Sequence, residues 1–119
     1  MDHFEHEKLD VYKTAIEFVA IAGDIIERLP QGYGPIRDQL LRASTSVALN
    51  IAEGAGEFAA DEKARFYRIA RRSATESAAI LDVCRTRKLI DPQPLGAGRE
   101  VLLRVVAMLT RMVLKLGDR

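Results

Sequence analysis

Seven basic side chains between residues 65 and 88 are the residues of this sequence whose type and spacing best suit a chemical task. They are Arg65, Arg68, Arg71, Arg72, Arg85, Arg87 and Lys88. Clustered cations bind phosphate groups, because each contact releases counterions that were condensed on the nucleic acid. On a helix, Arg65, Arg68 and Arg72 share one side. We therefore predict a candidate nucleic-acid surface here, with a solvated helix face as the alternative that the sequence leaves open.

Aromatic base stacking has little support within the same stretch. The stretch holds two aromatic residues, Phe66 and Tyr67, and Phe66 falls on the predicted apolar face of its helix. Binding of single strands by stacking needs several exposed rings along a groove. Contacts to phosphate are therefore the better-supported expectation for this stretch.

A second polar group lies in the stretch RASTSVALNIAEG, residues 42–54. Steps of four, four and three residues place its members in a line beside an apolar helix face. The members of this line are Arg42, Ser46, Asn50 and Glu53. We predict that they hydrogen-bond across helices, together with Glu76, as a structural polar cluster. Contact with a partner is the alternative interpretation.

Patterns typical of catalytic or metal sites are weak in this chain. His3 and His6 are two histidines near a chain terminus, which is a poor indication of metal binding. Cys84 falls on a predicted core stripe with no histidine near it, as a small buried hydrophobe would. Ser44 and Ser46 lack the base that a hydrolase requires. We therefore predict no enzymatic activity, no metal and no cofactor.

Length and charge limit the class of protein to which the chain can belong. The 119 residues suit one domain, 1–119, and a hydrophobic content of 48% with 29% charged residues is typical of a globular protein. The charge is uneven: residues 1–59 hold five basic and ten acidic residues, whereas residues 60–119 hold thirteen and seven. This division favours either a basic surface on the second half or attraction between the halves.

Cysteine usage and the first residues indicate a compartment. One cysteine cannot form an internal disulfide and is typical of a reducing environment. The N-terminal residues are acidic, unlike a signal peptide, and no apolar run is long enough to span a membrane. We therefore expect a cytoplasmic protein.

Apolar periodicity predicts four helices and no strand. The helices cover about residues 8–29, 35–53, 61–88 and from 95 or 98 to 116. Gly54 and Gly56 are expected to end the second helix, Asp61 to cap the third, and the segment 91–94, with two prolines, to break the chain. The expected core face of the third helix is Phe66, Ile69, Ala70, Ser73, Ser77, Ile80, Leu81 and Cys84. Short connections predict an all-α, up-down-up-down antiparallel four-helix bundle.

The first and last helices are apolar over more of their circumference than a monomeric bundle can cover. Two stripes run along residues 9–29, and a wide one runs along residues 101–116. Surplus apolar surface indicates contact with another chain. We therefore predict a homo-oligomer.

Three segments resemble a known family. They are FEHEKLDVYKTAIEF, YGPIRDQLLRASTSVALNIAEG and FYRIARRSATESAAILDVCRTRKLI. The chain is similar in them to the small bacterial four-helix bundles named after proteins encoded in intervening sequences of large-subunit ribosomal RNA genes. That family includes accessory variability proteins of diversity-generating retroelements. Arg72 departs from the family, which often has glycine there, and Ala60 lies near where a serine often begins the third helix.

The resemblance implies an assembly and no enzymatic activity. It implies a homo-oligomer, usually a pentamer, shaped as a tapered barrel, and for the retroelement branch it implies binding to nucleic acid and to a reverse transcriptase. We therefore expect a non-enzymatic oligomeric bundle that offers a basic surface to RNA, DNA or a nucleic-acid enzyme. The alternative is a scaffolding homo-oligomer that binds a protein partner.

Overall fold

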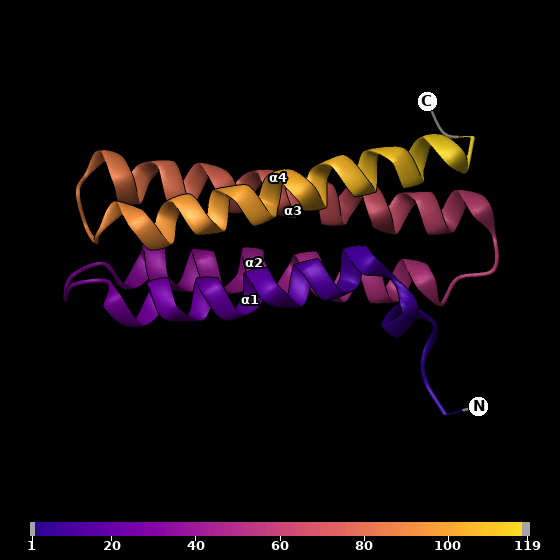
Figure 1. Cartoon of the computed structure of the whole chain (residues 1–119), viewed down its shortest axis with the longest axis horizontal. Helices are drawn as coiled ribbons and strands as arrows, with labels where there is room; N and C mark the ends of the chain where they lie inside the picture. The colour runs from indigo at the N-terminus through magenta and orange to yellow at the C-terminus, as the bar shows by residue number, and fades with distance from the viewer. Residues whose placement is uncertain (1, 118–119) are drawn as a thin grey trace.

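Four antiparallel helices in two layers make up the computed structural model, which describes residues 2–117. After a 3₁₀ turn, η1 (Glu5–Lys8), the helices are α1 (Asp10–Arg28), α2 (Gly34–Ala55), α3 (Ala60–Thr86) and α4 (Pro92–Lys115). In Figure 1, α1 and α2 form the lower layer and α3 and α4 the upper layer. The connections α1–α2 and α3–α4 lie at one end and α2–α3 at the other, which confirms the up-down-up-down bundle. The prediction of one domain over 1–119 includes residues 1, 118 and 119, which lie outside the described residues.

The core between the two layers is mostly aliphatic, with Phe18 and Tyr67 as its buried aromatic residues. Phe18, Ile25, Leu40, Ile51 and Leu109 are among its largest fully buried side chains. The face that α3 turns toward α2 is instead built from small residues: Ala70, Ser73, Ala74 and Ser77 are all buried. Small side chains let two helix backbones approach closely, so α2 and α3 form a tight pair.

The end of α2 differs from the prediction. Gly54 does not stop the helix, which continues to Ala55. A Cβ atom at Gly54 would lie 2.6 Å from Cε1 of Tyr67, so this glycine is needed for close packing. Gly56 follows the helix with a φ of −83°, which any residue can adopt, so it is not a left-handed cap.

The starts of three helices also differ from the prediction. Helix α4 begins at Pro92, because the first turn of a helix needs no backbone N–H donors and therefore accepts proline. Helix α3 begins at Ala60, and the carboxylate of Asp61 accepts a hydrogen bond from the N–H of Glu62 inside the first turn. Helix α1 begins at Asp10, since the residues before it form the separate turn η1.

The core face of α3 is rotated slightly from its predicted position. Tyr67 is buried with 3% of its surface exposed, whereas Phe66 and Ile69 are only half-buried. Burial raises the pKa of the Tyr67 phenol above its ordinary value of 10.0. Tyr67 is therefore a core residue that cannot stack on a nucleic-acid base.

Candidate nucleic-acid interface

The seven basic residues predicted to bind phosphate all lie on or just after α3, but the structure separates them. Helix α3 has 27 residues and is therefore about 40 Å long. Arg68, Arg71 and Arg72 form a first set that faces α4, and the basic residues at the end of the helix form a second set about 20 Å further along. The helix therefore spreads the predicted residues into separate sets along its length.

The first set forms one wall of a groove between α3 and α4, with a volume of about 630 Å³. We call it the α3–α4 groove. Its lining residues are Arg68, Arg71, Arg72, Thr75, Glu76, Ala79, Thr110, Val113 and Leu114. The three arginines lie within five consecutive residues, so the two turns of α3 at this point carry a dense positive charge beside an apolar wall from α4.

One hydrogen bond across the groove positions Arg71. Its Nη1 donates to Oγ1 of Thr110 on α4 over 3.3 Å, and this hydroxyl in turn donates to the carbonyl oxygen of Val106 over 2.8 Å. One edge of the Arg71 guanidinium is thus held in place by α4. The guanidinium has five N–H donors, so others are left for a ligand.

Arg65 lies outside the α3–α4 groove. Its Nε donates to both carboxylate oxygens of Glu62, at 3.2 and 3.0 Å, and its guanidinium lies 4.5 Å from the ring centre of Phe66. The local carboxylate offsets the charge of Arg65. The group of Arg65, Arg68 and Arg72 that helical spacing predicted is therefore replaced by Arg68, Arg71 and Arg72.

The second set lies where α3 ends. Arg85 and Lys88 line a separate hollow together with Leu89, Ile90, Asp91 and Pro92. Arg87 is the residue that follows the helix, and it is exposed like the other two. Cations at the last turn of a helix interact favourably with its dipole, so a structural role accounts for this set.

The predicted polar cluster is smaller than expected. Oγ of Ser46 lies 2.8 Å from Oγ of Ser73, and Nδ2 of Asn50 donates to the carbonyl oxygen and the hydroxyl of Ser46 at 2.9 and 3.0 Å. Ser73 replaces the predicted partner on α3, Glu76, which lies in the α3–α4 groove. The hydrogen bonds join α2 to α3, as a structural cluster should.

Arg42 and Glu53 are exposed and lie outside this cluster. Each helical residue turns by about 100°, so a step of four residues drifts by about 40° and a step of three by about 60° in the other direction. Over the eleven residues from Arg42 to Glu53 these drifts sum to about 20°, so both side chains lie on the same exposed edge of α2, about 60–80° away from Asn50. Contrary to the prediction, neither residue joins the cluster of Ser46, Asn50 and Ser73, and Glu76 lies apart from it in the α3–α4 groove.

Other chemically active residues serve the fold or the surface of the described chain. Cys84 is fully buried, and burial raises the pKa of its thiol. His3 hydrogen-bonds Asp2 at 2.8 Å, and the ring of His6 lies between those of Phe4 and Tyr12. Among residues 2–117, no group of three or more His, Cys, Asp or Glu side chains could hold a metal ion.

The structure thus defines an all-α four-helix bundle, with a basic groove between α3 and α4 and a polar link between α2 and α3. The family model of the 23S rRNA-intervening sequence protein matches residues 7–111. The chain belongs to this family, as the resemblance of its sequence predicted. Within the described residues, no helix is long and apolar enough to cross a membrane.

A solved structure supports the fold. It is the crystal structure of a protein of unknown function from the S23 ribosomal protein family of Bacteroides thetaiotaomicron VPI-5482. The two chains are 19% identical and superpose with a TM-score of 0.82 over 87% of this chain and 97% of that one. At this identity the likeness establishes the four-helix fold alone. A comparison with curated proteins finds no significant match.

Proposed function

We propose that this protein is a non-enzymatic, oligomeric binding protein whose α3–α4 groove holds the phosphates of RNA or DNA. The observation that carries the proposal is the gathering of Arg68, Arg71 and Arg72 in that groove, with Arg71 held by Thr110. Guanidinium groups bind phosphate through paired N–H donors, and a donor fixed in advance loses less entropy on binding. A reverse transcriptase is the protein partner that the retroelement branch of the family suggests.

Self-association would strengthen this binding. Leu41 and Leu49 on α2 and Leu103 and Leu114 on α4 are more than half exposed, and so is Phe58 in the α2–α3 connection. So many exposed large apolar side chains favour a homo-oligomer, for which the family resemblance suggests a pentamer. Each added copy repeats the groove, so weak contacts to one strand add by avidity.

The experiment is a salt titration of binding to a labelled RNA and a labelled DNA duplex. For the parent, log K should fall with log salt by about 0.9 per phosphate neutralised on duplex DNA, and by about 0.7 on single strands. Substitution of Arg68, Arg71 and Arg72 together by glutamine should weaken binding and flatten this slope. All three side chains are exposed, so the bundle should stay folded.

A matched control separates the groove from net charge. Substitution of Arg85, Arg87 and Lys88 by glutamine removes the same charge at the far end of α3, and it should leave most of the affinity intact. Equal losses in both triple variants would mean that net charge, and not the groove, holds the nucleic acid. Absence of binding at about 50 mM salt would contradict the proposed function.

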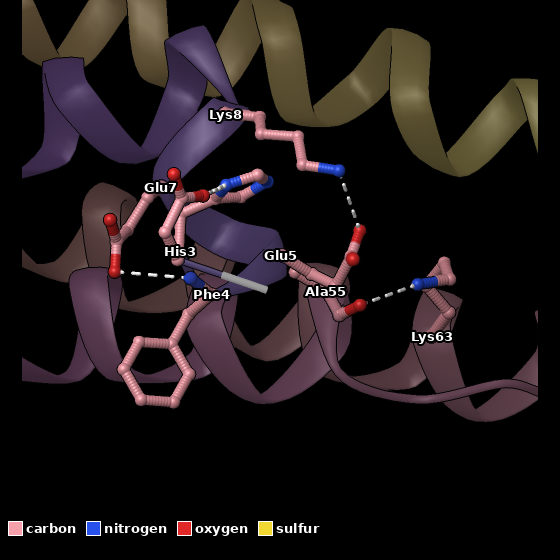
Figure 2. Close-up of polar contacts among 8 residues, drawn as sticks. His3, Phe4, Glu5, Glu7, Lys8, Ala55 and Lys63 are labelled. Carbon is pink, nitrogen blue, oxygen red and sulfur yellow. Dashed lines mark hydrogen bonds and ion pairs between the residues drawn. The ribbon is translucent and has the colours of Figure 1, made fainter.

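A scaffolding function is the second candidate, and one observation favours it. Beside η1, a hollow at the end of α2 is lined by Glu5, Glu53 and Glu57 together with the exposed ring of Phe4. Figure 2 shows this end of the molecule, where η1 contacts α2. An acidic surface with an exposed aromatic ring suits a basic protein partner. This candidate would gain support if nucleic acid failed to bind.

A further inference from the structure

We propose that the α3–α4 groove takes an unpaired guanine base, whose edge hydrogen-bonds the carboxylate of Glu76 while Arg68, Arg71 and Arg72 hold the neighbouring phosphates. This inference rests on the proposed function and narrows its ligand to single-stranded RNA or DNA that contains guanine. The feature behind it is a carboxylate placed in a groove otherwise suited to anions.

Glu76 is unexplained by phosphate binding. It lines the groove beside three arginines, yet within residues 2–117 it forms no ion pair or hydrogen bond. Arg72 lies four residues before it, a spacing at which opposite charges often pair, although this order of the two is the less favourable one. A free carboxylate repels phosphate, so its presence here lowers the affinity for a bare phosphate backbone. A ligand with hydrogen-bond donors would instead be bound by this carboxylate, which accepts hydrogen bonds.

The surroundings of Glu76 suit the flat face of a base. Ala79 lies on the same helix, and Val113 and Leu114 lie opposite on α4, with Leu114 62% exposed. The guanidinium planes of the groove's arginines offer a second surface on which a base can stack. Phosphates, base face and base edge thus each have a matching group within one groove.

Guanine is the base whose edge fits a carboxylate. A carboxylate only accepts hydrogen bonds, and its two oxygens can accept two parallel N–H groups. Guanine presents N1–H and the N2 amino group side by side, whereas the Watson–Crick edges of adenine, cytosine and uracil each place an acceptor next to their donor. These guanine donors are occupied in a duplex, so the ligand must be single-stranded.

The test compares uridine strands of equal length that carry one central guanosine, inosine or uridine, with binding to the full chain followed by fluorescence anisotropy at low salt. The guanosine strand should bind about tenfold more tightly than the uridine strand, as one bidentate base contact allows. Inosine lacks the N2 amino group and should lose most of that gain. A duplex containing the same guanosine should show no such gain over a duplex without it.

Glu76→Gln should abolish the preference, because an amide presents one acceptor and one donor in place of two acceptors. The same substitution should also raise the affinity for the uridine strand modestly, since a negative charge is lost. Asp82→Asn is the matched control: it removes the same charge from an exposed position of α3 outside the groove, and the preference for guanosine should persist.

The outcomes separate this inference from the proposed function. Equal binding of guanosine and uridine strands by the parent, with the salt slope and the arginine dependence intact, would overturn the guanine site alone. The guanine site would also be overturned if Glu76→Gln raised the affinity for the guanosine and uridine strands by the same factor, because Glu76 would then only repel phosphate. Absence of binding by every strand would overturn both proposals.

Discussion

Gly54 is the residue at which one missing side chain decides the packing of two helices. The ring of Tyr67 occupies the space in which a Cβ atom would lie, with Cε1 at 2.6 Å and Cδ1 at 2.8 Å. The ring belongs to a buried side chain and has little room to move. The glycine therefore sets how closely the end of α2 approaches the start of α3.

We expect Gly54→Ala to lower the free energy of unfolding by about 1–3 kcal/mol, because overpacking a filled site forces side chains or backbone to shift. Urea denaturation measures the change. Gly56→Ala is the control, since its Cβ would meet nothing closer than 3.7 Å, and it should be neutral or slightly stabilising. Equal stability of the parent and Gly54→Ala would show that Tyr67 moves aside freely.

The buried phenol of Tyr67 predicts a dependence of stability on alkaline pH. Its pKa is raised in the folded state, so the contribution of the neutral phenol is fully present below pH 10 and is lost as the pH rises through the folded pKa. Tyr67→Phe removes the ionisable group, and its free energy of unfolding should fall less steeply above about pH 10. Parallel curves for the two proteins in that range would contradict the burial effect.

At the scale of helices, two polar contacts hold α2 in place. One is the link from Ser46 to Ser73. The other is at the end of α2, where Nζ of Lys63 donates to the carbonyl oxygens of Gly54 and Ala55 at 2.9 and 3.1 Å. Figure 2 shows the bond from Lys63 to Ala55. A lysine there meets carbonyls that lack partners within the helix and the negative end of its dipole.

We expect Lys63→Gln to lower the free energy of unfolding by about 1 kcal/mol, because the shorter, neutral side chain loses charge-assisted bonds to two carbonyl groups. Lys13→Gln on the exposed surface of α1 is the matched control and should change the stability by less than about 0.5 kcal/mol. Thermal unfolding gives both values. A larger effect at Lys13 would contradict the capping role.

The polar link between α2 and α3 gives a further comparison. Ser73→Ala should cost about 1 kcal/mol, because the partly buried hydroxyl of Ser46 loses a partner. Glu53→Ala should stay within about 0.5 kcal/mol, since Glu53 is exposed and lies outside the link. The reverse order in denaturant titrations would place Glu53 in the structural cluster after all.

At the scale of the whole molecule, charge and apolar surface are unevenly distributed. The acidic first half of the chain supplies η1, α1 and α2, which form one layer, and the basic second half supplies α3 and α4 in the other (Figure 1). The bundle therefore has one acidic and one basic side, and large apolar side chains are exposed on both.

We expect light scattering at micromolar concentration to give a mass several times the 13.2 kDa of one chain, with five copies as the number that family resemblance suggests. Raising the salt should leave this mass unchanged, because apolar contacts are not weakened by screening. A monomer mass would contradict self-association and would remove the avidity on which the proposed binding depends.

The sequence by itself determined the four helices, their order and most of the core, because the apolar residues repeat with the period of a helix. It also determined the family, through segments such as RASTSVALNIAEG. Helix ends were predicted less well. At Gly54 and Pro92 the usual preferences of glycine and proline predicted a helix end and a break in the chain. Instead Gly54 lies inside α2, where Tyr67 packs against it, and Pro92 begins α4, because the first turn of a helix needs no backbone N–H donors.

Only the tertiary structure decided which polar residues meet. Spacing along one helix could not show that α4 brings Thr110 to Arg71, that Ser73 and not Glu76 meets Ser46, or that Arg65 is held by Glu62 outside the groove. Small rotations about a helix axis, accumulated over two or three turns, select one neighbour over another. Those rotations depend on how the helices pack, which periodicity in a single helix does not determine.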